Sequence, residues 1–174
     1  MAVGLAGLKM NDLAKHANLA TGTVYIYFGS KEELIRKLYG FIFESMTLDL
    51  QKGLDSEMDT RGKIRLACLN YVTEIIKHPE YKIFIEQFFR SPYFNEIDMD
   101  ILVVKAFIAP VHQLVLDGQQ EKVIKNTPAE LLIQLTRGAL EKYAYYITYS
   151  KKQLDPDEFD MVFDFIWNGG GVEQ

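Results

Sequence analysis

The side chains with the most binding chemistry in this sequence fall between residues 21 and 28, in the run TGTVYIYF. The hydroxyls of Thr23 and Tyr25 can hydrogen-bond to base edges or phosphates, and Ile26 carries methyl groups of the kind that contact thymine. Gly22 allows a backbone to come close to a partner. Because the run contains no Lys or Arg, it is poorly suited to reading guanine. We expect contacts that favour A·T pairs and DNA shape.

Two short helical patterns position these side chains. In the first, Leu13 and Ala17 recur at i and i+4, which gives one small apolar face on a helix of about two turns. Residues 18–19 interrupt it. In the second, Val24 and Phe28 share one side, and the remaining side chains are left free to contact a partner. Two short helices joined by a tight turn are typical of a helix-turn-helix that binds DNA.

A third helix is predicted to follow at once. Ser30 is a good N-cap, and Glu33, three residues on, completes a capping box. The apolar pattern then continues to about Leu50. A rigid helix of this length spans roughly 30 Å, so it would link the helix-turn-helix to the remainder of the chain.

The stretch from Lys9 to Tyr39 resembles the DNA-binding domain of the TetR family of bacterial transcriptional regulators. The resemblance rests on three segments, whose usual forms are IA..AG, GTLY.YF and SKE.L: here Leu13-Ala14 with Ala17, then residues 21–28, then Ser30-Lys31 with Leu34. It implies that six residues of the second helix face the major groove and its rims: Thr21, Gly22, Thr23, Tyr25, Ile26 and Tyr27.

Three further residues complete the predicted DNA-binding set. Lys31 lies at the capped start of the third helix, where its charge and free N–H groups would suit a phosphate. Lys9 and Asn11 lie at the start of the first motif helix. The position of Lys9 is often Ser or Thr in this family, and a lysine there either contacts a phosphate or stays solvated.

The residues before Leu8 depart from the family pattern. A TetR-like head normally has a helix of about a dozen residues there, whereas this chain has MAVGLAG, with two glycines that weaken any helix. We expect that first helix to be missing or incomplete. Either the chain starts downstream of its natural start, or the head is a depleted one whose DNA binding is impaired.

Composition and charge fit a globular protein with a locally basic head. The chain has 174 residues, a net charge of −5 and one cysteine, Cys68, which excludes an intrachain disulfide. Residues 1–39 carry five Lys or Arg and three Asp or Glu, a charge of +2, so the remainder carries −7. A local positive surface is enough for phosphate contacts. With neither a signal peptide nor a membrane span in the pattern, a soluble cytoplasmic protein is predicted.

The remainder of the chain predicts an all-α body. We assign residues 1–45 to a helix-turn-helix head, N-terminally incomplete, and residues 46–174 to a ligand-binding and dimerisation domain. The last two predicted helices, 129–150 and 156–167, are apolar on more than one face. Such helices either lie at the centre of a monomeric core or are covered by a second copy. The resemblance implies the latter, a homodimer joined through a four-helix bundle.

The expected function is that of a repressor released from its operator by a small apolar or aromatic ligand. Aromatic side chains are frequent in the body helices, which the resemblance implies surround a cavity for a small inducer. The predicted cavity lining is Phe84, Phe88, Phe107, His112 and Tyr143. The alternative for each of these residues is plain core. The predicted partners are an operator duplex, the ligand and a second copy of the chain. No cofactor, metal or catalytic constellation is predicted, so an enzyme is disfavoured. The alternative is a dimeric ligand-binding or interaction protein that does not bind DNA.

Overall fold

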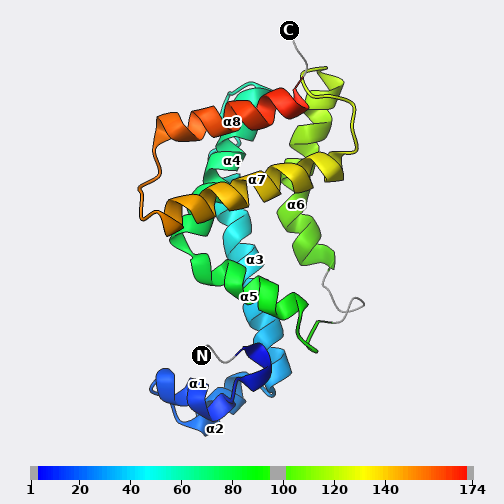
Figure 1. The fold of residues 1–174 in the computed structure, drawn as a ribbon. Coiled ribbons are helices and arrows are strands. Elements are labelled where there is room, and N and C mark those ends of the chain that lie inside the picture. The colour runs from blue at the N-terminus through cyan, green and yellow to red at the C-terminus, as the bar shows by residue number, and fades with distance from the viewer. Residues whose placement is uncertain (1–3, 95–100, 172–174) are drawn as a thin grey trace. The chain divides into compact units, whose positions relative to one another are not determined.

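The computed structural model describes residues 4–94 and 101–171, and every regular element in those ranges is helical (Figure 1). The only β-type pairing in the described ranges is an isolated bridge between Ile124 and Gly171. In chain order, the elements are the 3-10 helix η1 (Leu5–Gly7) and the α-helices α1 (Met10–His16), α2 (Thr21–Tyr27), α3 (Lys31–Gln51), α4 (Thr60–Lys77), α5 (Pro79–Phe89), α6 (Ile101–Gln120), α7 (Ala129–Tyr149) and α8 (Pro156–Gly170). The all-α prediction is confirmed.

The chain divides into two compact units. The first comprises residues 1–44 and 80–104, and the second comprises residues 45–79 and 105–174. The predicted boundary after residue 45 falls beside the first of these division points, but α5 groups with the helix-turn-helix residues. The assignment of separate DNA-binding and ligand-binding domains stays a prediction.

The turn between α1 and α2 is made by a left-handed residue. Asn18 has φ 55°, a conformation that Asn tolerates better than most side chains because its short amide can bond locally. The N–H of Leu19 then donates to the carbonyl of Ala14 at 2.9 Å, which closes a Schellman-type helix end. This turn lets α2 pack on α1, with Ala14 and Val24 buried.

The predicted cap of α3 is present. The Ser30 hydroxyl oxygen accepts the Glu33 N–H at 3.1 Å, and the Glu33 carboxylate accepts the Gly29 N–H at 2.9 Å. Because one free N–H at the helix start is satisfied and Glu33 also binds the N–H of Gly29 just before the cap, α3 has a defined beginning directly after α2. It then runs to Gln51, about where the sequence pattern predicted.

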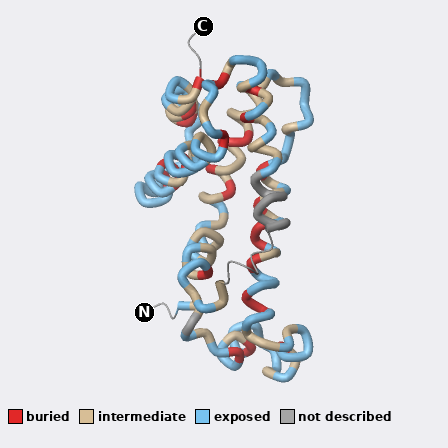
Figure 2. The backbone as a smooth tube through the Cα atoms, turned by 90° about the vertical axis from the view of Figure 1, so that its right-hand side faces the viewer, coloured by how far each residue is buried: buried red, intermediate tan, exposed pale blue. Residues whose placement is uncertain are grey.

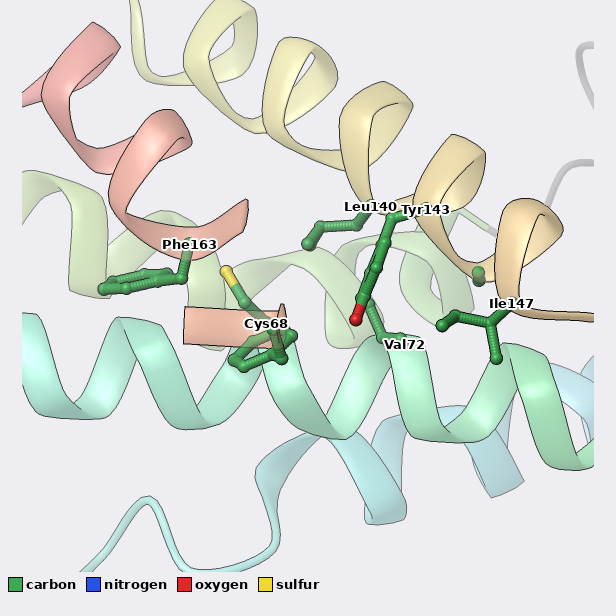
Figure 3. Close-up of a cluster of buried hydrophobic side chains, with 8 residues drawn as sticks. Cys68, Val72, Leu140, Tyr143, Ile147 and Phe163 are labelled. Atoms are coloured by element: carbon green, nitrogen blue, oxygen red, sulfur yellow. The ribbon is translucent and has the colours of Figure 1, made fainter. Parts of the chain in front are cut away.

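The second unit has its core between α4, α7 and α8. Cys68 and Val72 of α4 meet Tyr143 and Ile147 of α7 and Phe163 of α8 (Figure 3). Figure 2 shows buried residues recurring along the long helices and interrupted by exposed ones, as expected for helices that present one face to a core. Among the described residues, no helix is both long and apolar enough to span a bilayer.

One carboxyl group is buried in this unit. Glu74 of α4 is buried, and its Oε1 has no hydrogen-bond partner among the described residues. Burial and a hydrogen-bonded neighbour, Asp49 of α3, raise the pKa of Glu74, while His78 and Lys77 oppose that rise. One turn earlier in α4, the amide of Asn70 donates to the carbonyls of Leu50 and Lys52, at 3.2 and 2.9 Å. The end of α3 is therefore attached to α4 by polar side chains.

We expect Glu74→Gln to stabilise the protein above neutral pH. Since the pKa of Glu74 is raised in the folded state, its protonated form stabilises the fold at acidic pH. That stabilisation is lost as the pH rises through the raised pKa. A glutamine can donate to Asp49 at every pH, so the free energy of unfolding at pH 8 should rise by roughly 1 kcal/mol.

Urea denaturation between pH 5 and pH 8 measures this effect. Glu44→Gln, which changes an exposed glutamate of α3, is the matched control and should leave the pH dependence unchanged. A Glu74→Gln protein that is less stable than the wild type at pH 8, with the same pH dependence, would contradict the expectation.

Candidate DNA-binding surface and interior cavity

Helix α2 gives little of its surface to the fold. Val24 is its one buried residue, whereas the side chains of Ile26, Tyr27 and Tyr25 are 83%, 69% and 48% exposed. Large apolar side chains are normally buried in a folded chain. Helix α2 therefore presents an aromatic and aliphatic surface that its own unit leaves largely uncovered.

A single face of α2 combines three of the predicted DNA-binding residues. Gly22, Tyr25 and Ile26 are related by i, i+3 and i+4, so they lie together on the helix surface. A Cβ built on Gly22 would meet no described atom within 4 Å. We call Gly22, Tyr25 and Ile26 the reading face. It leaves room for another molecule to approach the backbone.

The other predicted DNA-binding residues lie in and around the same motif. Thr21 and Thr23 are partly buried in α2, and Tyr27 is exposed at its end. Lys9 and Asn11 are exposed at the start of α1, where Lys9 makes no side-chain cap bond. The motif therefore brings the predicted set into one part of the first unit, and the DNA-binding role of these residues stays a prediction.

Lys31 has a second possible role that the sequence did not indicate. It is the first residue of α3, and its Nζ lies 5.3 Å from the centroid of the Tyr93 ring in the same unit. A cation over an aromatic face contributes about 0.5–1 kcal/mol at an exposed site. This contact can hold the ammonium group near the capped start of α3, where a phosphate would also be attracted.

The second unit contains an apolar cavity of about 130 Å³. Residues of α4, α6, α7 and α8 supply most of its walls. They are Leu50, Ile64, Ala67, Cys68, Tyr71, Val111, Leu114, Val115, Ile124, Leu132, Ile133, Gln134, Thr136, Arg137, Leu140, Phe163, Ile166, Trp167, Gly170 and Gly171. A protein cavity of about 150 Å³ with aliphatic and aromatic walls can bind benzene. The cavity is therefore of a size for a small apolar group.

Two polar side chains of the cavity wall, those of Tyr71 and Arg137, interact with the same carboxylate. The Tyr71 hydroxyl donates to the Glu141 carboxylate at 3.0 Å, and the Arg137 guanidinium lies 3.6 Å from the same carboxylate. Burial, followed by the negative charge of Glu141, raises the pKa of Tyr71. Burial likewise raises the pKa of the Cys68 thiol to about 12. Both groups are therefore neutral at physiological pH.

Of the five predicted ligand-binding residues, Phe84, Phe88, His112 and Tyr143 are not among those that line this cavity. Phe84 and Phe88 belong to the first unit, where Phe88 stacks on Tyr39 with ring centroids 4.4 Å apart. In the second unit, His112 Nε2 lies 3.0 Å from a Glu130 carboxylate oxygen, and Tyr143 is a core residue. The side chain of Phe107 lies outside the described residues. The ligand-binding role of these five residues stays a prediction.

Helices α7 and α8 expose large apolar side chains in pairs spaced by four residues. The pairs are Leu131 and Leu135, Tyr145 and Tyr149, and Met161 and Phe165. The two tyrosine rings stack with centroids 5.8 Å apart, and Phe165 is 82% exposed. Such i, i+4 pairs form continuous strips on a helix. The two helices that the sequence predicted to be apolar on more than one face do have uncovered apolar surface in the single chain.

A left-handed turn followed by a short, largely exposed helix, on a chain that is otherwise helical, defines a helix-turn-helix protein with an all-α body. Residues 1–38 match the model of the bacterial regulatory proteins of the tetR family. This match covers the helix-turn-helix residues and agrees with the resemblance that the motif predicted.

One curated relative is an uncharacterized HTH-type transcriptional regulator of Haemophilus influenzae, 31% identical over 98 residues. The alignment covers 56% of this chain and 52% of that protein, so the chain matches about half the length of this relative.

Two solved structures share the fold. A putative tetR family transcription regulator from Shewanella superposes with a TM-score of 0.81 at 21% identity, covering 99% of this chain and 92% of that one. The regulator FadR from Bacillus subtilis, solved in complex with stearoyl-CoA, superposes with a TM-score of 0.76 at 16% identity, covering 96% and 91%.

The single cysteine offers a direct probe of the cavity. Thiol reagents react with the thiolate form of cysteine. Because Cys68 is buried and its pKa is raised, we expect a thiol reagent at pH 8 to label it at least about a hundredfold more slowly in the native protein than in urea. Saturation with indole, as a small aromatic probe, should slow native labelling further by filling the cavity. A Cys68→Ala, Ser150→Cys protein, with its thiol on an exposed position, is the control. Native labelling at the unfolded rate would contradict this account.

Proposed function

We propose that this protein is a transcriptional regulator that binds double-stranded operator DNA through α2. The observation that carries the proposal is the reading face, in which Tyr25 and Ile26 stand uncovered beside the bare backbone of Gly22. A helix of this kind, set behind a tight turn, fits the major groove. The TetR-family match of residues 1–38, which include α1 and α2, supports the same role.

The proposed regulator acts as a homodimer. The exposed apolar strips on α7 and α8 supply a surface that a second copy of the chain would cover. A two-fold dimer presents two reading faces to two half-sites of an operator, and each additional half-site multiplies the affinity. The predicted four-helix bundle, formed from α7 and α8 of each subunit, is the simplest arrangement that covers all the strips.

The proposed signal is a small apolar or aromatic ligand in the cavity of the second unit. Its walls are mainly aliphatic and aromatic, and the Tyr71 hydroxyl among them already donates to Glu141. The similar fold of FadR, solved with stearoyl-CoA, supports a ligand-binding body of this type. A ligand that binds one body conformation more tightly shifts the population towards it. In a repressor, the favoured conformation is the one that releases the operator.

Gly22→Ala tests the DNA-binding proposal without disturbing the fold. The added methyl meets no described atom within 4 Å and should stabilise the helix by about 0.5–1 kcal/mol. The same methyl occupies space that the DNA would use, so affinity for duplex should fall about tenfold, or roughly 1.4 kcal/mol.

The duplexes for this measurement come from selection on a randomised library, titrated at two salt concentrations. Gly40→Ala in α3 is the matched control, since its added methyl also meets open space, and it should leave the affinity unchanged. Wild-type binding should weaken steeply with salt, because phosphate contacts release counterions. Failure to retain any duplex at low salt would favour the alternative, a dimeric ligand-binding protein without DNA affinity.

Phe165→Lys tests the dimer. A charge in the centre of the proposed bundle should weaken self-association about thirtyfold or more, in the range of an interface hot spot. Leu48→Lys, at another highly exposed apolar position but on α3, is the control and should leave association unchanged. Sedimentation across a range of concentrations measures both variants, and an unaltered dimer with Phe165→Lys would contradict the proposed interface.

A further inference from the structure

We propose that Ile26 determines operator specificity by packing against the C5-methyl group of a thymine in the major groove. This inference rests on the proposed function, since it names what the reading face recognises. It assigns base discrimination to an aliphatic side chain in a helix that contains no Lys or Arg.

The fold of the first unit does not account for Ile26. At 83% exposure it is the most exposed of the large hydrophobic side chains in the described residues. The buried position of α2 is filled by Val24, on another side of the helix. An exposed isoleucine forgoes about 1.5–3 kcal/mol of burial free energy. That free energy is available to a partner that covers the side chain.

The residues around Ile26 indicate which kind of molecule can bind there. One turn earlier, Gly22 has no side chain, and no described atom approaches the position of its missing Cβ. A partner can therefore come close to the helix backbone beside Ile26. Tyr25, the next residue on this face, adds an aromatic ring and a hydroxyl. The reading face as a whole is uncharged, so its recognition must rely on apolar contact and on neutral hydrogen bonds.

Thymine is the base that matches this chemistry. In the major groove, guanine presents two acceptors that suit Arg or Lys, and cytosine presents an amino group, whereas thymine presents a methyl group. The β-branched side chain of isoleucine is restricted about χ1, so it loses little conformational freedom when it packs on that methyl. Ile26 would thus distinguish T·A from C·G at one base pair in each half-site, through a methyl group that cytosine lacks.

The experiment removes the proposed contact between Ile26 and the thymine methyl group in two ways, by changing the DNA and by changing the protein. Duplexes selected from a randomised library are remade with one thymine at a time replaced by deoxyuridine, which lacks only the C5-methyl group. Binding of each duplex is then measured for the wild type, for Ile26→Ala and for Ile83→Ala. Ile83 lies on α5 of the same unit and is 57% exposed, so its variant makes the same chemical change away from the reading face.

We expect one deoxyuridine position per half-site to weaken wild-type binding about fourfold, the equivalent of burying one methyl group. Ile83→Ala should keep this sensitivity, and Ile26→Ala should lose it while still binding duplex. Equal sensitivity in Ile26→Ala and the wild type, or selected sites without a sensitive thymine, would overturn the inference. A library from which the wild type selects no duplex would instead overturn the proposed function, and this inference with it.

Discussion

The head depends on the packing of α1 against α2. Helices of seven residues are too short to persist alone in water, and each has few residues in its core: Met10 and Ala14 are buried in α1, and Val24 in α2. What holds them together is the left-handed turn at Asn18, which brings the two helices into contact, and the capped start of α3 directly afterwards. With so small a core, most of α2 remains at the surface, and this allows it to act as a binding element.

The second unit follows a different principle, because its long helices bury continuous faces. Among the described residues, α4 and α7 pack against each other most extensively, and α8 contacts both. Two departures from a fully packed apolar core stand out. One is the cavity bounded by Cys68 and Leu140; the other is Glu74, a carboxyl group buried opposite Asp49. Both forgo stability that a filled, neutral core would have.

Local signals in the sequence were sufficient for the helices and for the motif. Ser30 with Glu33 marked the start of α3, and Pro156 marked that of α8, because caps and prolines act within one turn of chain. The exposed face of α2 followed from the spacing of Val24 and Phe28, which share one side of the helix and leave its other side chains free. The cavity did not follow, because Leu132 and Leu140 line it from the same helix that builds the core. Helical periodicity separates inside from outside, but it does not separate a cavity wall from packed interior.

The aromatic residues also show that helical periodicity does not predict which buried side chains line a cavity. Phe88 has the type and spacing of a pocket residue, yet it stacks on Tyr39 in the first unit, a partner 49 positions away that no local pattern specifies. Large apolar side chains are therefore found in three environments here. Ile147 lies in the core, Leu132 lines the cavity, and Ile26 and Phe165 lie uncovered on the surface. Only the first contributes its full burial free energy to the single chain. The other two leave part of that free energy unused, and a ligand, a second copy or a DNA methyl group can recover it on binding.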